Sequence, residues 1–394
     1  MTEVPRELWP ILCRLATSRE WPPRGDADVA AFFDYANHQR LLSLLIADDD
    51  LPQEVIAAKP RFRALDALSR KRYELSRAGV LELQRVLGAD AFVFYKGSDY
   101  RHHLYDRPEQ RPMADIDVYI PSVELPAALR KLEAAGYSRT YVDFAGFSPW
   151  HYEISVVVAG VHVELHRGFS QRVRAAIDYD GMWRRREWFE RDGVSGYRLS
   201  PADALLAHAF GLAKDEFSSE LNRFLDFYLL LQRYGGELDT CVARAKAWQI
   251  ERPLFGALHL TSAMFPGAKT AAVSQAMDAV LDPPTRQLLV DQVLPDPTAE
   301  RSGWVSGRRM QLRRKLALID RRWRRAALVV DYIHATAVGL VFEWRARRGG
   351  LNIPPRSMVR SHNRWQPFID HRVTFPQHPS KAEHDSLSKS GGGL

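Results

Sequence analysis

Apolar and polar residues follow three successive patterns along the chain. Up to residue 88, apolar side chains recur at helical spacing in RELWPILCRLA, AAFFDYANHQRLLSLLIADD and RFRALDALSRKRYELSRAGVLELQRVLG. The last of these segments stops at Gly88, a residue type that is common at helix ends. We therefore expect residues 1–88 to form an N-terminal helical region.

The second pattern consists of short apolar and β-branched runs. AFVFYKGS (91–98) and DIDVYIP (115–121) predict two strands, and EISVVVAGVHVELH (153–166) predicts a hairpin that turns at Ala159 and Gly160. SVELPAALRKLEAAGY, between the second strand and the hairpin, predicts a helix. We expect residues 89–198 to form a mixed core of strands and helices.

Helical spacing returns after residue 198, first in LSPADALLAHAFGLAKDEF and then in ELNRFLDFYLLLQRYGG. The pattern predicts a helical domain over 199–300 and a basic helical region over 301–375. The polar, glycine-ended residues 376–394 are expected to be disordered.

The composition is that of a soluble globular protein, because 46% of the 394 residues are apolar and 26% are charged. The N-terminal MTEVPRELWP does not resemble a signal peptide. Only two cysteines occur, Cys13 and Cys241, and they are far apart. These features favour a reducing, cytoplasmic location and argue against a disulfide framework or a cysteine-rich zinc site.

The positive charge is concentrated in one segment. Residues 301–325 contain ten Lys or Arg and one Asp, a local net charge of +9 in a chain whose total is +7. The rest of the chain therefore carries −2. The run is either a solvated helix face or a surface for phosphates, RNA or anionic lipid.

One segment is apolar for nearly a membrane-spanning length. In ALVVDYIHATAVGLVFEW (327–344), however, Asp331, His334 and Glu343 interrupt the apolar run. A charge in the middle of a bilayer costs at least ~2.5 kcal/mol, so a helix in the protein core is favoured and membrane contact is not expected.

Two aspartates stand one residue apart in DIDVYIP. Side chains at i and i+2 point to one face of a strand, so Asp115 and Asp117 are expected side by side while Ile116 and Val118 face the core. Paired carboxylates need a nearby cation, and a few oxygen ligands suit Mg²⁺, which completes its shell with phosphate and water. The pair is interpreted as half of a metal site. A turn cap and an arginine partner are the structural alternative.

Two neighbouring motifs strengthen this interpretation. The Gly97–Ser98 turn ends a strand and opens a helix, an arrangement whose backbone N–H groups can meet a phosphate. VHVELH places His162, Glu164 and His166 on one strand face, where Glu164 supplies a third carboxylate. The two histidines are about 13 Å apart at ~3.3 Å per residue, so these three side chains cannot together ligate one zinc ion.

KGS, R-P-M-x-D-I-D and V-E-L-H together resemble the DNA polymerase β-like nucleotidyltransferase superfamily, and within it the bacterial uncharacterised nucleotidyltransferase family. L-S-P-x-D-x-L-L-x-H followed by R-F-L-D is similar to the next segment of that family. The resemblance covers residues 75–235. It implies an α+β fold with a small mixed β-sheet flanked by helical regions. It also implies Mg²⁺-dependent transfer of a nucleoside monophosphate from an NTP such as ATP, with Mn²⁺ as the alternative metal.

The resemblance further implies a role for each motif residue. Asp115, Asp117 and Glu164 would be catalytic and would hold the metal, with Glu164 ligating a second metal ion or deprotonating the acceptor hydroxyl. Gly97 and Ser98 would bind the β- and γ-phosphates.

Chemistry suggests further contacts around this centre. Arg111 can reach a phosphate or pair with an acid, and Lys214 can reach the triphosphate; both are included as nucleotide-binding candidates. Lys96 is expected to point to the other face of the sheet, and His166 to pack rather than to orient Glu164.

Three functions remain open. An active enzyme can use a small hydroxylated molecule, a protein or peptide side chain, or an RNA end as its acceptor, and residues 301–325 favour an anionic acceptor such as RNA. The alternatives are a catalytically silent nucleotide- or RNA-binding module and a peripheral membrane protein. The presence of all three carboxylates favours the enzyme.

Overall fold

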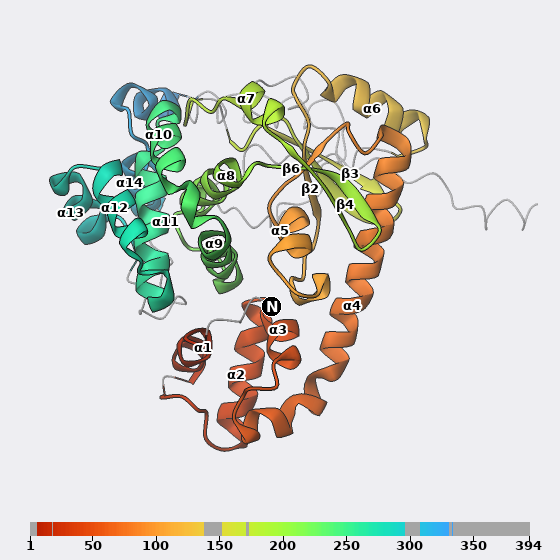
Figure 1. The fold of residues 1–394 in the computed structure, drawn as a ribbon, viewed down its shortest axis with the longest axis vertical. Coiled ribbons are helices and arrows are strands. Elements are labelled where there is room, and N and C mark those ends of the chain that lie inside the picture. The colour runs from red at the N-terminus through yellow and green to blue at the C-terminus, as the bar shows by residue number, and fades with distance from the viewer. Residues whose placement is uncertain are drawn as a thin grey trace, which may run out of the picture.

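The computed structural model describes residues 6–17, 19–137, 152–170, 173–295, 308–330 and 333. Within these residues, the chain forms one six-stranded mixed sheet surrounded by helices (Figure 1). The predicted α+β fold is thus confirmed.

The strands form a sheet in the order β3-β4-β2-β1-β6-β5. The pairs β2–β4 and β1–β6 are parallel, and the other neighbours are antiparallel. The strand bounds are β1 Val93–Phe94, β2 Ile116–Tyr119, β3 Glu153–Val158, β4 Val161–His166, β5 Glu187–Arg191 and β6 Val194–Arg198.

Helices precede, interrupt and follow the sheet. Those before β3 are α1 Leu8–Thr17, α2 Asp26–His38, α3 Leu42–Ala47, α4 Gln53–Leu87, α5 Gly97–His103 and α6 Leu125–Ala134, with the 3-10 turn η1 Pro108–Gln110. Those after β4 are α7 Tyr179–Arg184, α8 Pro201–Lys214, α9 Leu221–Tyr234, α10 Leu238–Trp248, α11 Glu251–Met264, α12 Ala271–Val280, α13 Pro283–Gln292 and α14 Arg308–Ala317, with the 3-10 turns η3 Gly235–Glu237 and η4 Pro266–Ala268.

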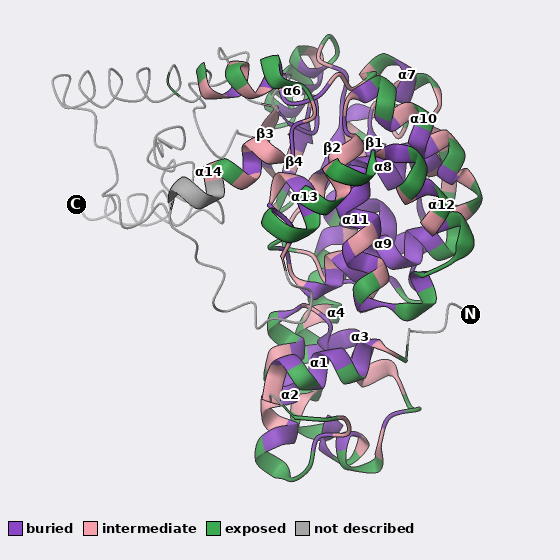
Figure 2. Cartoon of the chain, turned by 90° about the vertical axis from the view of Figure 1, so that its left-hand side faces the viewer, coloured by how far each residue is buried: buried purple, intermediate pink, exposed green. Residues whose placement is uncertain are grey.

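The long helix α4 connects the N-terminal helices to the sheet. Figure 1 shows α1, α2 and α3 grouped at one end of the molecule, with α4 running from them along one side to the strands. The helices α8 to α13 lie on the other side. Buried residues are concentrated along α9 and α11 (Figure 2), where apolar side chains form the centre of the helical part.

The two faces of the sheet are covered differently. Ile116 and Val118 pack in an apolar cluster with residues of α4 and α6. Tyr119 belongs to the other cluster, which includes residues of α8 and α9. The predicted alternation along this strand is confirmed, so Asp117 is on the face opposite α4 and α6.

The hairpin β3–β4 turns at the predicted residues. Ala159 (φ 50°) and Gly160 (φ 78°) both have positive φ, as a two-residue type I′ turn requires. A second hairpin, β5–β6, was not predicted. Its signal was Asp192-Gly193, and these residues also have positive φ (54° and 72°).

Part of the basic segment packs against α10, α11 and the loop before α7. Arg324 is buried and donates hydrogen bonds to Gln249 and to the carbonyl oxygens of Val173 and Ala175. Asp320, the single acid of the run, accepts hydrogen bonds from the backbone N–H groups of residues 251 and 252 at the start of α11. These contacts hold residues 320–324 on the molecule.

No helix in the described part of the chain is both long enough and apolar enough to cross a membrane. Most of the apolar segment 327–344 and all of the expected tail 376–394 lie outside the described residues.

Candidate active site

Two of the predicted carboxylates come from neighbouring parallel strands. In the β2–β4 ladder, Asp117 stands opposite Glu164. Residues in register on adjacent strands point to the same face of a sheet, so both side chains lie on the face opposite α4 and α6. This places two carboxylates from distant motifs beside each other.

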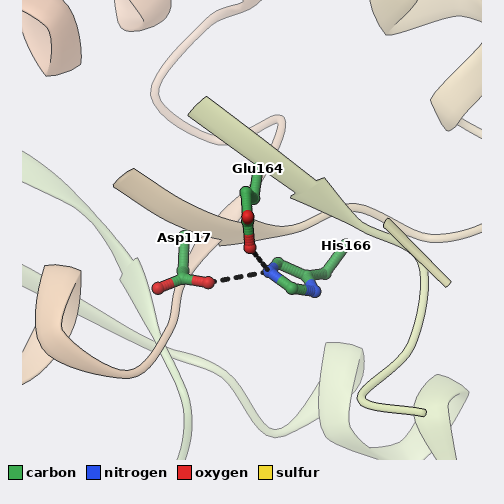
Figure 3. Close-up of side chains that lie close together, drawn as sticks. All are labelled: Asp117, Glu164 and His166. Atoms are coloured by element: carbon green, nitrogen blue, oxygen red, sulfur yellow. Dashed lines mark hydrogen bonds and ion pairs between the residues drawn. The ribbon is translucent and has the colours of Figure 1, made fainter. Parts of the chain in front are cut away.

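His166 lies between these carboxylates. Its Nε2 atom is 2.8 Å from Oδ1 of Asp117 and 3.3 Å from Oε2 of Glu164. Figure 3 shows both carboxylates pointing toward this ring nitrogen. The imidazole is fully buried and packs edge-on against Tyr95, with ring centroids 5.1 Å apart. Packing thus fixes the ring where it can bind both acids.

Lys96 also binds Asp117. Its Nζ atom is 2.6 Å from Oδ1, the oxygen that also faces His166. The expectation that Lys96 points to the other face of the sheet is wrong, because its backbone has φ 53° and therefore leaves the strand conformation. The ammonium group supplies positive charge to the carboxylate cluster.

The Gly97–Ser98 turn adjoins the same cluster. Ser98 Oγ accepts a hydrogen bond of 2.8 Å from the backbone N–H of Asp117. A Cβ atom added at Gly97 would lie 2.9 Å from Met113 Sδ, which is too close without movement of that side chain. The turn therefore combines a fixed hydroxyl group with a residue at which a side chain would displace Met113.

The pKa of Asp115 is shifted by burial and by the charges of the other two acids. Burial, followed by the negative charges of Asp117 and Glu164, raises the pKa of Asp115 to about 7. Lys96 and Arg40 oppose this rise. The three predicted carboxylates therefore repel one another, and this repulsion makes Asp115 the one that is most easily protonated.

Asp117 and Glu164 behave in the opposite way. Burial by itself would raise both pKa values, but Lys96 and His166 hold the pKa of Asp117 below its usual range, and the hydrogen bond from His166 lowers the pKa of Glu164. The same two carboxylates raise the pKa of His166 against the effect of burial. Two acids are thus kept ionised at neutral pH while the third shares the site with them.

A divalent cation fits the donors of this cluster. Asp117, Glu164 and His166 can each offer a ligand atom, and these atoms lie within 4.8 Å of one another. Within the described residues, no partner contacts Oδ2 of Asp117 or Oε1 of Glu164. Oxygen donors of this kind suit Mg²⁺ or Mn²⁺.

The two basic candidates have different surroundings. Arg111 is buried and forms an ion pair with Asp226, with Nη2 2.7 Å from Oδ2. It therefore has the structural role that was one of its two expected roles, and contact with a phosphate remains a prediction. Lys214 donates a hydrogen bond of 3.3 Å to the hydroxyl of Tyr152. The ring of Tyr152 stacks on that of His166, with ring centroids 6.4 Å apart. Lys214 thus stands at the edge of the cluster.

Sequence reasoning underestimated His166 and did not include Glu153. Glu153 stands opposite His166 in the β3–β4 ladder, with Oε2 3.6 Å from Nδ1 of the ring. The His-x-Glu-x-His alternation placed His166 on the carboxylate face, but only the pairing of β4 with β2 brings it to Asp117.

The model of the family described as uncharacterised nucleotidyltransferase matches residues 25–266. The match extends beyond the predicted range of 75–235 on both sides, so it adds α2 and α3 before the sheet and α10 and α11 after it. No curated protein matches the chain.

Proposed function

The chain belongs to the uncharacterised nucleotidyltransferase family, and from this premise we propose that it transfers a nucleoside monophosphate from an NTP to an acceptor hydroxyl with the help of a divalent cation. The family match supports nucleotidyl transfer as the general activity. The observation that carries the finer proposal is the meeting of Asp117 and Glu164, in register on parallel strands beside the Gly97–Ser98 turn. Each of these carboxylates has one oxygen that no described residue contacts.

Asp115, Asp117 and Glu164 are the proposed ligands of Mg²⁺ or Mn²⁺. When bound, the cation would neutralise charge on the triphosphate and the leaving pyrophosphate. His166 holds the carboxylates of Asp117 and Glu164 in place through Nε2. Lys96 keeps Asp117 ionised, so that this carboxylate is ready as a ligand at neutral pH.

The chemical step is an in-line displacement at the α-phosphorus of the NTP. The acceptor oxygen forms a bond to this phosphorus, the bond from the phosphorus to the bridging oxygen breaks, and pyrophosphate leaves. Glu164 is the proposed acceptor of the hydroxyl proton, because its lowered pKa keeps it ionised. Gly97 and Ser98 are proposed to hold the β- and γ-phosphates, with Lys214 at the triphosphate as a further contact.

We expect an NTP to stabilise the protein only in the presence of Mg²⁺. A ligand at about 100 times its dissociation constant raises the free energy of unfolding by about 2.7 kcal/mol. Thermal unfolding with ATP, GTP, CTP and UTP, each with Mg²⁺ or with EDTA, measures this effect and identifies the preferred nucleotide.

The double variant Asp115→Asn/Asp117→Asn should lose the Mg²⁺-dependent shift while it keeps the wild-type far-ultraviolet circular dichroism spectrum. Asp34→Asn is the matched control, because Asp34 is exposed on α2, and it should keep the full shift. A shift that persists in the double variant would place the nucleotide elsewhere. No shift with any NTP would favour the catalytically silent module in its RNA-binding form.

The affinity for Mg²⁺ should rise with pH. Asp115, with a pKa of about 7, must release its proton before it can act as a ligand. A carboxyl with this pKa is mostly protonated at pH 6 and mostly ionised at pH 8, so we expect the apparent association constant to increase about tenfold over this range. Calorimetric titration of the nucleotide-free protein with Mg²⁺ at the two pH values tests this, and a pH-independent constant would remove Asp115 from the ligand set.

A further inference from the structure

A cavity of 510 Å³ lies between the N-terminal helices and the carboxylates. Its walls come from the α2–α3 connection, α4, the loop before β2 and the β3–β4 turn. All of these segments lie within the part of the chain that the family model matches. Pockets of about 300–1,000 Å³ are typical of small-molecule sites, so the cavity has the size of a substrate site.

Asp115, which directly precedes β2, forms a row with Asp117 on β2 and Glu164 on β4, and we call it the carboxylate row. The strand register places the cavity at one end of this row. Asp115 precedes Ile116, which pairs with Val163, so Asp115 falls at the level of His162, and both residues line the cavity. Asp117 and Glu164 occupy the next level along the two strands.

The opposite end of the row is formed by other residues. His166 pairs with Glu153 at the next level, and Tyr152 and Lys214 adjoin them there. A transfer reaction brings two reactants to opposite sides of the reacting phosphorus. If the NTP occupies the end with Lys214, the cavity is the place for the second reactant.

The lining of the cavity favours an acidic occupant. Arg40, Arg72, His38 and His162 line it, against the single carboxylate of Asp115. Among the described residues, Arg72 has no hydrogen-bond or ion-pair partner, whereas Arg40 lies 3.6 Å from Glu220. The free guanidinium can bind a carboxylate or a phosphate in bidentate fashion.

Ser43 is the second indication of a ligand. It lines the cavity, is only 2% exposed, and its Oγ atom has no hydrogen-bond partner. A buried hydroxyl without a partner destabilises a protein unless something binds it. The cavity wall therefore contains a hydroxyl group without a partner, close to the guanidinium groups of Arg40 and Arg72.

We propose that this cavity binds the acceptor, and that the acceptor is a small hydroxylated molecule bearing a carboxylate or a phosphate. The inference rests on the proposed nucleotidyl transfer. The acidic group binds Arg72 and Arg40, Ser43 adds a hydrogen bond, and a hydroxyl of the acceptor reaches the carboxylate row past Asp115. The acidic group of the acceptor thus anchors it in the cavity, and its hydroxyl group remains free to react.

Three six-carbon probes test this: glucose 6-phosphate, gluconate and glucose, each at about 10 mM, a range suited to weak specific binding. Thermal unfolding is measured with Mg²⁺ and a non-hydrolysable analogue of the preferred NTP, and label transfer is measured with the α-³²P-labelled NTP. We expect glucose 6-phosphate or gluconate to raise the melting temperature and to accept label, and the difference between them identifies the acid. Glucose should do neither.

The variants Arg72→Met and Ser43→Ala locate the effect. Arg72→Met should raise the KM for the acidic probe about tenfold, which corresponds to one charged hydrogen bond, and leave the KM for the NTP unchanged. Ser43→Ala should raise the melting temperature of the free protein and shrink the shift caused by the probe. Arg63→Met, an exposed change on the same helix that does not line the cavity, should behave as wild type.

The remaining outcomes separate the two proposals. If an NTP with Mg²⁺ does not raise the melting temperature of the wild type, the proposed nucleotidyl transfer itself is overturned. A normal NTP shift with no response to either acidic probe, or an Arg72→Met variant that weakens the NTP instead of the probe, overturns only the acceptor assignment. Transfer of label to RNA or to a polypeptide with a KM insensitive to Arg72→Met does the same.

Discussion

Asp115→Asn should be more stable than the wild type at pH 8 in the absence of metal, and it should have lost nucleotidyl transfer. Asp115 lies near two ionised carboxylates, and its pKa in the folded protein is about 7 against an ordinary value of 3.8. The folded state thus binds the proton more tightly than the unfolded state does. Stability from this group falls as pH rises from about 4 to about 7, and the full penalty applies above pH 7.

An asparagine removes the negative charge and with it this penalty. The pKa difference corresponds to a gain on the order of 2–4 kcal/mol at pH 8, after allowance for partial exposure of the carboxyl group to solvent. The gain should be about 1–2.5 kcal/mol smaller at pH 5, where the wild type keeps its proton. Urea denaturation in EDTA at both pH values measures the difference.

Asp34→Asn is again the matched control and should change stability by less than about 0.5 kcal/mol at either pH. A stability gain for Asp115→Asn that is equal at the two pH values would show that its origin is not the charge. A loss of stability would contradict the repulsion inferred for the three acids.

The face to which each side chain of β2 points was predictable, because it depends only on the local sequence. The spacing of Ile116 and Val118 against Asp115 and Asp117 follows from the two-residue period of a strand, and the apolar pair packs against α4 and α6 as expected. The hairpin turn at Ala159–Gly160 followed from its small residues in the same way. Local periodicity and turn chemistry are sufficient for such features.

The arrangement of the site was less predictable because it depends on pairing between distant segments. The motifs indicated that Asp117 and Glu164 act together, but their register depends on the parallel pairing of β2 and β4, which no local pattern specifies. The ion pair between Arg111 and Asp226 joins residues that are far apart in the sequence. Lys96 reaches the site because its backbone has a positive φ of 53°, which is unusual for lysine and was not expected from the sequence.

Asp117→Asn should have the opposite effect on stability, although it changes the same chemical group two residues away. Asp117 forms an ion pair of 2.6 Å with Lys96 and a hydrogen bond of 2.8 Å with His166, and these contacts hold its pKa below its usual range. Its contribution to stability is present above the unfolded pKa of about 4 and is lost only as pH falls toward the folded value. At pH 8 the variant therefore loses all of it.

The loss should be on the order of 3 kcal/mol, because the substitution removes the carboxylate that forms the ion pair with the ammonium of Lys96. Transfer activity should fall at least a hundredfold, since a group that stabilises charge in the transition state is removed. Urea denaturation at pH 8 in EDTA and a transfer assay with Mg²⁺ measure the two effects, and the stability change should have the opposite sign to that of Asp115→Asn.

A double-mutant cycle with Lys96→Met separates the ion pair from other consequences of the change. Removing both charges leaves neither one unpaired, so Lys96→Met/Asp117→Asn should be more stable than the sum of the single changes predicts, by at least about 1 kcal/mol. Additive losses would mean that the two side chains act independently in solution. In that case Lys96 could not be what keeps Asp117 ionised, and the supply of an ionised ligand at neutral pH would have to come from His166 alone.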